Sequence, residues 1–206
     1  MPRIGILGGS FNPPHNGHIE MLTWALIEKG LDFVAFMPTK KNPEKLESEA
    51  TVTSADDMQR LEMLKLITKH NDNFSIITDE LNDREVSYTY NTMKRLREDY
   101  IGCEIFFIIG TDALFGIEGW HRGAELLREN KFIVGKRPHD SLDRINEKID
   151  ELSRKYGTEI LLINQDMPEL SSTSIREKIK NGEDITDLVP QRVMQYIKDE
   201  GLYKND

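Results

Sequence analysis

Two histidines three residues apart, His15 and His18, have the types and spacing best suited to chemistry. They end a turn, residues 8–18, that lies between an apolar strand pattern at residues 3–7 and a helical pattern at residues 16–29. Folds of the α/β class place phosphate groups at such turns, because the helix N-terminus offers unpaired N–H groups and a partial positive charge. The two imidazoles are expected to share one face at that end of the helix.

Hydrogen-bond donors in this position suit a displacement at the α-phosphorus of ATP. In that reaction negative charge builds on the phosphoryl oxygens and on the leaving pyrophosphate, and positioned donors lower the barrier without a covalent intermediate. Each histidine has one or two N–H groups to donate, depending on its protonation. The pattern therefore predicts a phosphate site that needs no protein nucleophile.

Other interpretations of the turn stay open when its residues are taken alone. Either histidine can be an ordinary surface or core residue, and Gly8 and Gly9 fit a plain strand–helix connection. A zinc site is a further alternative, although helical zinc pairs usually lie four residues apart and need a third ligand, which is not seen nearby. The turn does not fit the G-x-G-x-x-G fingerprint, which argues against a dehydrogenase.

A second candidate anion site is the hydroxyl-rich start of a predicted helix over residues 172–181. Ser172 and Thr173 can satisfy N–H groups at the helix start or help to bind an anion there. Arg176, one turn further, presents a fork that matches two phosphate oxygens. The alternative is a serine-rich helix cap followed by a solvated arginine.

The chain of 206 residues has a formal net charge of −9 and one cysteine, Cys103, so no intrachain disulfide is expected. The acidic balance argues against polymeric nucleic acid as a partner, because binding to a phosphate backbone usually leaves a basic footprint. The longest apolar run, residues 105–109, has the length of a strand and not of a membrane span. No signal-peptide pattern is seen, so we expect a cytoplasmic protein with no membrane partner. Assembly into a homo-oligomer is left open.

Short apolar runs alternate with helical patterns, which predicts a doubly wound, Rossmann-like α/β fold with a parallel sheet. One domain is expected over residues 1–206, with a small helical extension at about residues 171–206. Strands are expected at residues 3–7, 33–37, 74–78, 104–109, 131–134 and 159–163. Helices are expected at residues 16–29, 142–156, 172–181 and 190–200, and from about residues 88–91. Ser54 and Asp57 are expected to open a further helix as a capping box, with Met58, Leu61, Leu64 and Ile67 on its apolar face.

The histidine turn resembles a known signature. Residues 9–18 are similar to the (G)-[ST]-F-[DN]-P-x-H-x-G-H motif of the nucleotidyltransferase α/β-phosphodiesterase superfamily, and residues 171–176 are similar to its S-S-T-x-I-R segment. The resemblance implies that His15, His18 and Arg176 are catalytic, with the imidazoles at the α-phosphate and the second segment at the β- and γ-phosphates. The ATP site that it implies consists of Gly8, Gly9, Ser10, Phe11, His15, His18, Gly110, Asp112, Ser172, Thr173 and Arg176.

Three further segments resemble the nicotinate-nucleotide branch of that superfamily: residues 87–93, residues 109–121, and residues 189–203. The resemblance implies that the substrates are ATP and nicotinate mononucleotide and that the products are deamido-NAD and pyrophosphate, as in NAD biosynthesis. The implied acceptor site consists of Tyr88, Thr89, Trp120 and Lys45.

The residue types fit these roles. Trp120 offers a flat ring on which a pyridine can stack, Thr89 with nearby backbone N–H groups can hold a carboxylate, and Asp112 can accept from ribose hydroxyls. The alternatives are core packing for Trp120, helix caps for Thr89 and Asp112, and a solvated charge run for Lys40, Lys41 and Lys45 in the loop at residues 39–53.

The resemblance also implies Mg²⁺ bound mainly through phosphate and water oxygens of ATP, so no metal ligand is expected from the protein. The chain departs from the family in two places. Residues 42–45 read Asn-Pro-Glu-Lys where a Pro-His-Lys ending is common, and residues 135–138 read Gly-Lys-Arg-Pro where a small or apolar residue, Arg, and then Arg-Pro-Gly are more usual.

The competing hypotheses are a sister transferase (for pantetheine phosphate, a nicotinamide nucleotide, or CTP with a polyol phosphate) and a non-catalytic nucleotide-binding module.

Overall fold

The computed structural model describes residues 1–40, 55–82 and 88–204. Its centre is a six-stranded parallel sheet with the strand order β3-β2-β1-β4-β5-β6. The strands are β1 (Arg3–Gly9), β2 (Phe33–Pro38), β3 (Phe74–Ile76), β4 (Glu104–Gly110), β5 (Lys131–Lys136) and β6 (Ile160–Asp166). The order reverses between β1 and β4, and ligands of such sheets bind beyond the carboxyl ends of the strands at this reversal.

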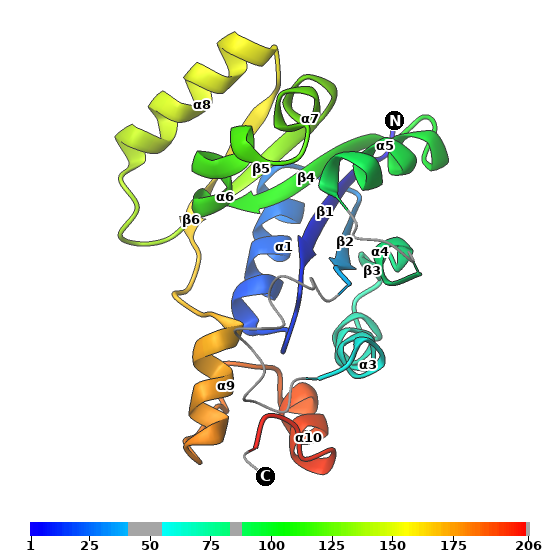
Figure 1. The fold of residues 1–206 in the computed structure, drawn as a ribbon, viewed down its shortest axis with the longest axis vertical. Coiled ribbons are helices and arrows are strands. Elements are labelled where there is room, and N and C mark those ends of the chain that lie inside the picture. Colours follow the sequence, from blue (N-terminus) through cyan, green and yellow to red (C-terminus); the bar gives the residue numbers. More distant parts are fainter. Residues whose placement is uncertain (41–54, 83–87, 205–206) are drawn as a thin grey trace.

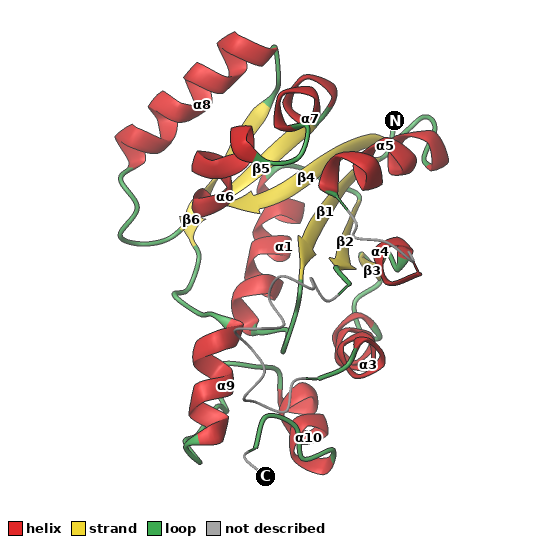
Figure 2. Cartoon of the chain, in the orientation of Figure 1, coloured by secondary structure: helices red, strands yellow, loops and turns green. Residues whose placement is uncertain are grey.

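Helices cover both faces of the sheet (Figures 1 and 2). The helices that follow the first three strands are α1 (Asn16–Glu28), α3 (Asp57–Thr68), α4 (Asp79–Asn82) and α5 (Thr89–Asp99). Those that follow β4 and β5 are α6 (Thr111–Gly116), the 3₁₀ helix η2 (Ile117–Gly119), α7 (Gly123–Glu129) and α8 (Leu142–Tyr156). The last two are α9 (Ser172–Lys180) and α10 (Gln191–Asp199). The predicted doubly wound, Rossmann-like α/β fold is confirmed.

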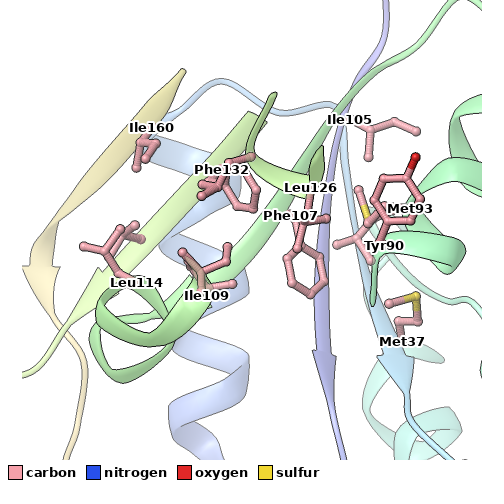
Figure 3. Packing of buried hydrophobic residues seen from close by; sticks show 14 of the residues in the cluster. Met37, Tyr90, Met93, Ile105, Phe107, Ile109, Leu114, Leu126, Phe132 and Ile160 are labelled. Atoms are coloured by element: carbon pink, nitrogen blue, oxygen red, sulfur yellow. The ribbon is translucent and has the colours of Figure 1, made fainter. Parts of the chain in front are cut away.

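Two apolar clusters sandwich the sheet, and alternate residues of each strand enter opposite clusters. On β4, Phe106 and Ile108 pack toward α1 and α3, whereas Phe107 and Ile109 pack toward α5, α6, α7 and α8. Figure 3 shows this second cluster, with Ile109 beside Leu114 of α6 and Phe107 beyond Ile109. The run at residues 105–109 is continuously apolar because a central parallel strand is buried on both faces.

Helices α9 and α10 lie beyond the carboxyl ends of β1 and β2, where Figure 1 draws them in orange and red. They have an apolar cluster of their own, which includes Ile175 of α9, Val193 of α10, Tyr203 and, from α3, Met63. The predicted helical extension is therefore present, and α3 joins it to the sheet.

Local details of the prediction were wrong around α3 and β3. The residue that caps α3 is Asp56, which has an extended backbone, and its side chain accepts from the backbone N–H of Gln59 at 2.8 Å. The expected capping box of Ser54 and Asp57 is therefore incorrect, and Ser54 lies outside the described residues. Met58 is 61% exposed, so it does not belong to the buried face of the helix. Strand β3 ends at residue 76 and not at residue 78.

The predicted loop at residues 39–53 lies almost entirely outside the described residues, and Lys41 and Lys45 with it. None of the helices that are described is long and apolar enough to cross a membrane.

Gly123 begins α7 at a position where no side chain fits. A Cβ atom there would lie 2.3 Å from the carbonyl oxygen of Ile117 and 2.9 Å from that of Glu118. Backbone atoms cannot move aside as the end of a flexible side chain can, so we expect Gly123→Ala to lower the free energy of unfolding by about 1–3 kcal/mol. Urea denaturation measures this change. Gly119→Ala is the matched control, because a Cβ atom at Gly119 meets nothing within 4 Å; equal stabilities of the two variants would contradict the prediction.

Candidate active site

A cleft of about 330 Å³ opens at the carboxyl edge of the sheet, where the strand order reverses. Its wall is formed by the turn after β1, α1, the ends of β4 and β5, the segment after β6 and the start of α9. The lining residues are Ser10, His15, Gly17, His18, Met21, Gly110, Thr111, Gly135, Arg137, Met167, Pro168, Leu170, Ser171, Ser172, Thr173 and Arg176. The two segments singled out in the sequence, the histidine turn and the hydroxyl-rich helix start, thus share one cleft.

The imidazole rings of His15 and His18 stack on each other, with centroids 3.6 Å apart and an interplanar angle of 22°. The backbone N–H of His15 donates to Nδ1 of His18 at 3.2 Å. Because Nδ1 of His18 is the acceptor, its neutral ring has the proton on Nε2, which is then a donor. The ring of Phe11 meets the His18 ring edge-on at 4.9 Å and closes the side of His18 away from His15.

Both histidines are held in the neutral form. Burial lowers the pKa of His15 from its ordinary value of 6.5 to about 4. Burial also lowers the pKa of His18 well below 6.5, and the neighbouring His15 lowers it further. A charged imidazole loses hydration when it is buried, so the neutral form is favoured. At neutral pH each ring therefore offers one N–H donor and no positive charge.

Gly17 is the residue that leaves room for the His15 ring. A Cβ atom at Gly17 would lie 3.1 Å from Nδ1 of His15, closer than ordinary packing allows. This Nδ1 atom is buried and has no hydrogen-bond partner among the described residues. Because this atom is buried, a ligand in the cleft can be bound only by the other ring nitrogen, Nε2.

The start of α9 is bonded directly to the histidine turn. The Ser172 hydroxyl donates to the carbonyl oxygen of Pro13 at 2.8 Å, across 159 residues of sequence. Nη1 of Arg176 donates to the carbonyl oxygen of Asn12 at 2.8 Å, and its Nη2 donates to the Thr173 hydroxyl at 3.3 Å. These bonds fix the guanidinium in the wall of the cleft that also holds both imidazoles.

Ser171 precedes the helix, and its hydroxyl oxygen accepts from the backbone N–H of Ser174 at 3.1 Å. The helix cap is thus the task of Ser171, and the hydroxyl of Thr173 lies on the cleft side. The capping interpretation therefore applies to Ser171, whereas the anion-binding interpretation of Thr173 stays a prediction.

Arg60 supports the histidine turn through hydrogen bonds to backbone carbonyl oxygens. No sequence motif indicated this role. Arg60 is 1% exposed, donates to the carbonyl oxygen of Ser10, and donates to the carbonyl oxygen of Thr39 at 2.8 Å. It also pairs with Asp57 at 2.8 Å, which is the actual role of that carboxylate. One buried guanidinium thus joins the turns after β1 and β2. The sequence signal that could have indicated its burial is its position on α3: Arg60 lies three residues before Met63 and shares the buried face of the helix.

The end of β4 contributes Gly110 and Thr111 to the cleft. The Thr111 hydroxyl and the backbone N–H of Arg137 both donate to Oδ2 of Asp140 at 2.7 Å. Burial raises the pKa of Asp140, but these two hydrogen bonds outweigh it and hold that pKa below its ordinary value. Asp112, by contrast, is largely exposed, pairs with Arg137 at 3.0 Å and does not line the cleft.

Three more of the residues expected in the ATP site lie behind the cleft wall and not in it. Cβ atoms at Gly8 and Gly9 would lie 3.2 Å and 3.1 Å from the rings of Phe107 and Phe11. Phe11 is 1% exposed and meets the ring of Phe36 edge-on at 5.3 Å. The apolar ring turns into the core, so these residues shape the turn from inside.

The residues expected to bind the acceptor form a second group at the start of α5. The Tyr88 ring stacks on the ring of His121 with centroids 4.1 Å apart, which brings Tyr88 and Thr89 to the segment that contains Trp120. Trp120 is partly buried and packs against the second apolar cluster. None of Tyr88, Thr89 and Trp120 lines the cleft, and Lys45 lies outside the described residues.

The apolar part of the cleft escaped the sequence analysis. A Cβ atom at Gly135 would lie 2.8 Å from Cε of Met21 and 3.1 Å from Cγ of Met167. Glycine at this position therefore makes room for both thioether side chains in the lining. Methionines in a helix or after a strand give no signal of their own, because they fit any apolar contact.

Comparison with known proteins agrees with this architecture. The family model described as cytidylyltransferase-like matches residues 6–178. The nicotinate-nucleotide adenylyltransferase of Bacillus subtilis is 36% identical over 207 residues, covering 100% of each chain. A probable nicotinate-nucleotide adenylyltransferase of Clostridium tetani is 34% identical over 204 residues, covering 99% of this chain and 100% of its own.

Solved structures share the fold. Nicotinic acid mononucleotide adenylyltransferase of Plasmodium falciparum, complexed with NaAD, superimposes with a TM-score of 0.78 at 22% identity, covering 98% of each chain. Its complex with APC gives a TM-score of 0.77 at 21% identity over the same shares. From the family model and the two bacterial relatives, the chain belongs to the nicotinate-nucleotide adenylyltransferase family of cytidylyltransferase-like nucleotidyltransferases.

Proposed function

We propose that this nucleotidyltransferase transfers the adenylyl group of ATP to nicotinate mononucleotide, as a cytoplasmic step of NAD biosynthesis. The observation that carries the proposal is the shared cleft, in which His15 and His18 face the start of α9 with Thr173 and Arg176. The two bacterial relatives described above, with the same name and matched end to end, support the choice of acceptor.

The reaction is one in-line displacement. A phosphate oxygen of nicotinate mononucleotide attacks the α-phosphorus of ATP, the bond from that phosphorus to the α–β bridging oxygen breaks, and pyrophosphate leaves. The product is nicotinate adenine dinucleotide (deamido-NAD). The attacking oxygen is already anionic, so the protein needs neither a nucleophile nor a base, and its contribution is position and charge stabilisation.

The residues of the cleft divide this work. His18 donates from Nε2 to the α-phosphoryl oxygens, and His15 donates beside it. Arg176 and Thr173 hold the β- and γ-phosphates, and the negative charge that develops on the leaving pyrophosphate strengthens these hydrogen bonds. Ser172 fixes the helix start through its bond to Pro13. Because the imidazoles are neutral, Arg176 is the group that supplies full positive charge on this side of the cleft.

The acceptor binds at the second group of residues. Trp120 stacks on the pyridine ring, Thr89 and the N–H groups at the start of α5 hold the carboxylate, and Tyr88 covers the site. Lys45 contributes to acceptor binding. Asp112 belongs to the ATP site in this proposal and accepts from a ribose hydroxyl of ATP after parting from Arg137.

Mg²⁺ enters with ATP in this proposal. The lining offers hydroxyl, imidazole and guanidinium groups, which suit phosphate oxygens better than they suit a hard cation that prefers oxygen ligands. The described residues contain no group of three or more histidine, cysteine or acidic side chains that could hold a metal ion. When it is bound to the triphosphate, the ion neutralises part of the phosphate charge.

The acceptor is tested by a coupled assay with ATP and each of nicotinate mononucleotide, nicotinamide mononucleotide and pantetheine phosphate. Nicotinate mononucleotide should give the highest kcat/KM, and equal values for all three would reject the assignment. Trp120→Ala should raise the KM for nicotinate mononucleotide by about tenfold through the lost stacking, with the KM for ATP unchanged. The chain has one other tryptophan, Trp24. Trp24→Ala is the control and should leave both KM values at those of the wild type.

The donor role of His18 is tested by His18→Ala. We expect kcat to fall by at least about a hundredfold, as for other lost transition-state donors. Circular dichroism should show a folded protein, because the ring of His18 borders the cleft and not the sheet. His70→Ala, a change of an exposed histidine after α3, should keep full activity. A folded His18→Ala variant with wild-type kcat would exclude the donor role.

The depressed pKa of His15 gives the folded protein a specific acid sensitivity. Between pH 6.5 and about 4 an unfolded chain binds a proton at this residue that the folded chain does not bind. The free energy of unfolding should therefore fall as the pH is lowered through this window, with up to ~3 kcal/mol from His15 alone. In His15→Gln, denaturation curves should show a smaller loss over the same range. His139→Gln, at a side chain 84% exposed, should keep the wild-type loss; equal losses in both variants would contradict the assignment.

A further inference from the structure

Asn12 connects Arg176, which lies in the wall of the cleft, to Tyr203. The Tyr203 hydroxyl donates to Oδ1 of Asn12 at 2.6 Å, and the two residues are 191 positions apart. The carbonyl oxygen of the same Asn12 accepts from Nη1 of Arg176 at 2.8 Å. A single residue of the histidine turn is therefore held through its side chain by Tyr203 and holds Arg176 through its backbone.

The contact between Asn12 and Tyr203 is enclosed on every side. Tyr203 is 0% exposed and Asn12 is 4% exposed. Tyr203 packs in the cluster of α3, α9 and α10, beside residues such as Ile175 and Leu202. Burial raises the pKa of Tyr203 above its ordinary value, so the hydroxyl keeps its proton and acts as a donor. The loss of a buried hydrogen bond of this kind is costly, because bulk water cannot readily reach the pair.

Backbone strain lies on both sides of this hydrogen bond. Tyr203 has a φ of 64°, and Phe11, the neighbour of Asn12, has a φ of 48°. Bulky residues are uncommon in the left-handed region and stay there only when the surrounding contacts impose it. The backbone at Tyr203 and beside Asn12 thus adopts conformations that depend on the surrounding contacts.

We propose that Tyr203 is a positioning residue for adenylyl transfer, which fixes Asn12 so that the Asn12 carbonyl aims the Arg176 guanidinium at the phosphates of ATP. Tyr203 itself touches no substrate in this proposal, which rests on the function proposed above. A guanidinium fork gives its full interaction only in a narrow geometry, so a small displacement of the carbonyl that holds it weakens its grip on two phosphate oxygens.

A purely structural role for Tyr203 predicts different changes in kcat and KM. A variant that merely folds less well contains fewer active molecules, which lowers the apparent kcat and leaves both KM values unchanged. A misaimed Arg176 instead weakens the hold on ATP in every folded molecule. The KM for ATP is therefore the quantity that separates the two roles.

Tyr203→Phe in the full chain removes the hydroxyl and keeps the ring in its apolar cluster. We expect the KM for ATP to rise by about fivefold, the usual effect of one lost hydrogen bond, while the KM for nicotinate mononucleotide changes by less than about twofold. Tyr196→Phe is the matched control, because Tyr196 is a partly buried tyrosine of the same cluster. It should keep both wild-type KM values. Identical behaviour of the two variants would overturn the proposal.

A double-mutant cycle with Arg176→Lys tests whether Tyr203 acts through the guanidinium. When the fork is already lost, adding Tyr203→Phe should leave the KM for ATP unchanged, because coupled residues do not contribute independently. A full fivefold effect in the Arg176→Lys background would show a route that does not pass through Arg176 and would overturn the proposal. If Tyr203→Phe fails to fold, Asn12→Ala removes the acceptor of the same hydrogen bond and should raise the KM for ATP in the same way.

Calorimetric titration of each variant with ATP alone separates this proposal from the proposed function. A wild-type protein that binds ATP but does not convert nicotinate mononucleotide would reject the function, and the ATP affinities of Tyr203→Phe and Tyr196→Phe would still test the positioning role. A wild-type enzyme that converts nicotinate mononucleotide, together with equal ATP affinities of the two variants, would reject only the positioning role.

Discussion

The backbone carbonyls of Asn12 and Pro13 are the points on which the cleft depends. Each accepts one hydrogen bond from α9, the first from Arg176 and the second from Ser172. The histidine turn is built on the edge of the rigid parallel sheet, whereas α9 belongs to a smaller cluster with α10 and α3. Together with the bond from Tyr203 to Asn12, these two bonds connect the turn that contains the imidazoles to the helix that contains the guanidinium. With them, the donors lie around one cavity before any ligand arrives, which is the preorganisation that electrostatic catalysis needs.

The proposed substrate ATP is a polyanion, although the chain is acidic overall. Its formal net charge is −9, so the general field of the protein repels ATP. The cleft compensates locally with N–H and hydroxyl groups, and with the cations of Arg137 and Arg176. Burial keeps His15 and His18 neutral, so they add donors without adding charge of their own. Recognition by dipoles and hydrogen bonds is specific for the shape of a phosphate chain, whereas a broad positive surface would attract any anion.

The sequence predicted the sheet and both halves of the cleft because these features leave local signals. Strands buried on both faces read as apolar runs. The spacing of glycine, histidine, serine and arginine matches two known motifs, at residues 9–18 and 171–176. The supporting residues leave no such signal. Arg60 and Tyr203 act through contacts with residues far away in the sequence, and Met21, Gly135 and Met167 meet only after the sheet has formed. The cap of α3 was misplaced because Ser54, Asp56 and Asp57 lie close together in the sequence and each residue type can serve as a cap.

The proposed dependence of the cleft on Tyr203 has a consequence for the stage of synthesis at which the cleft can assemble. The sheet is complete once β6 has formed, so an emerging chain can already fold most of its core. The residues that form and support the cleft, however, are far apart in the order of synthesis: the histidines are made before the sheet is complete, and Arg176 and its proposed positioning residue Tyr203 are made after β6. With the proposed roles, a nascent chain therefore lacks an assembled nucleotide site until residues 176–203 can pack against the histidine turn.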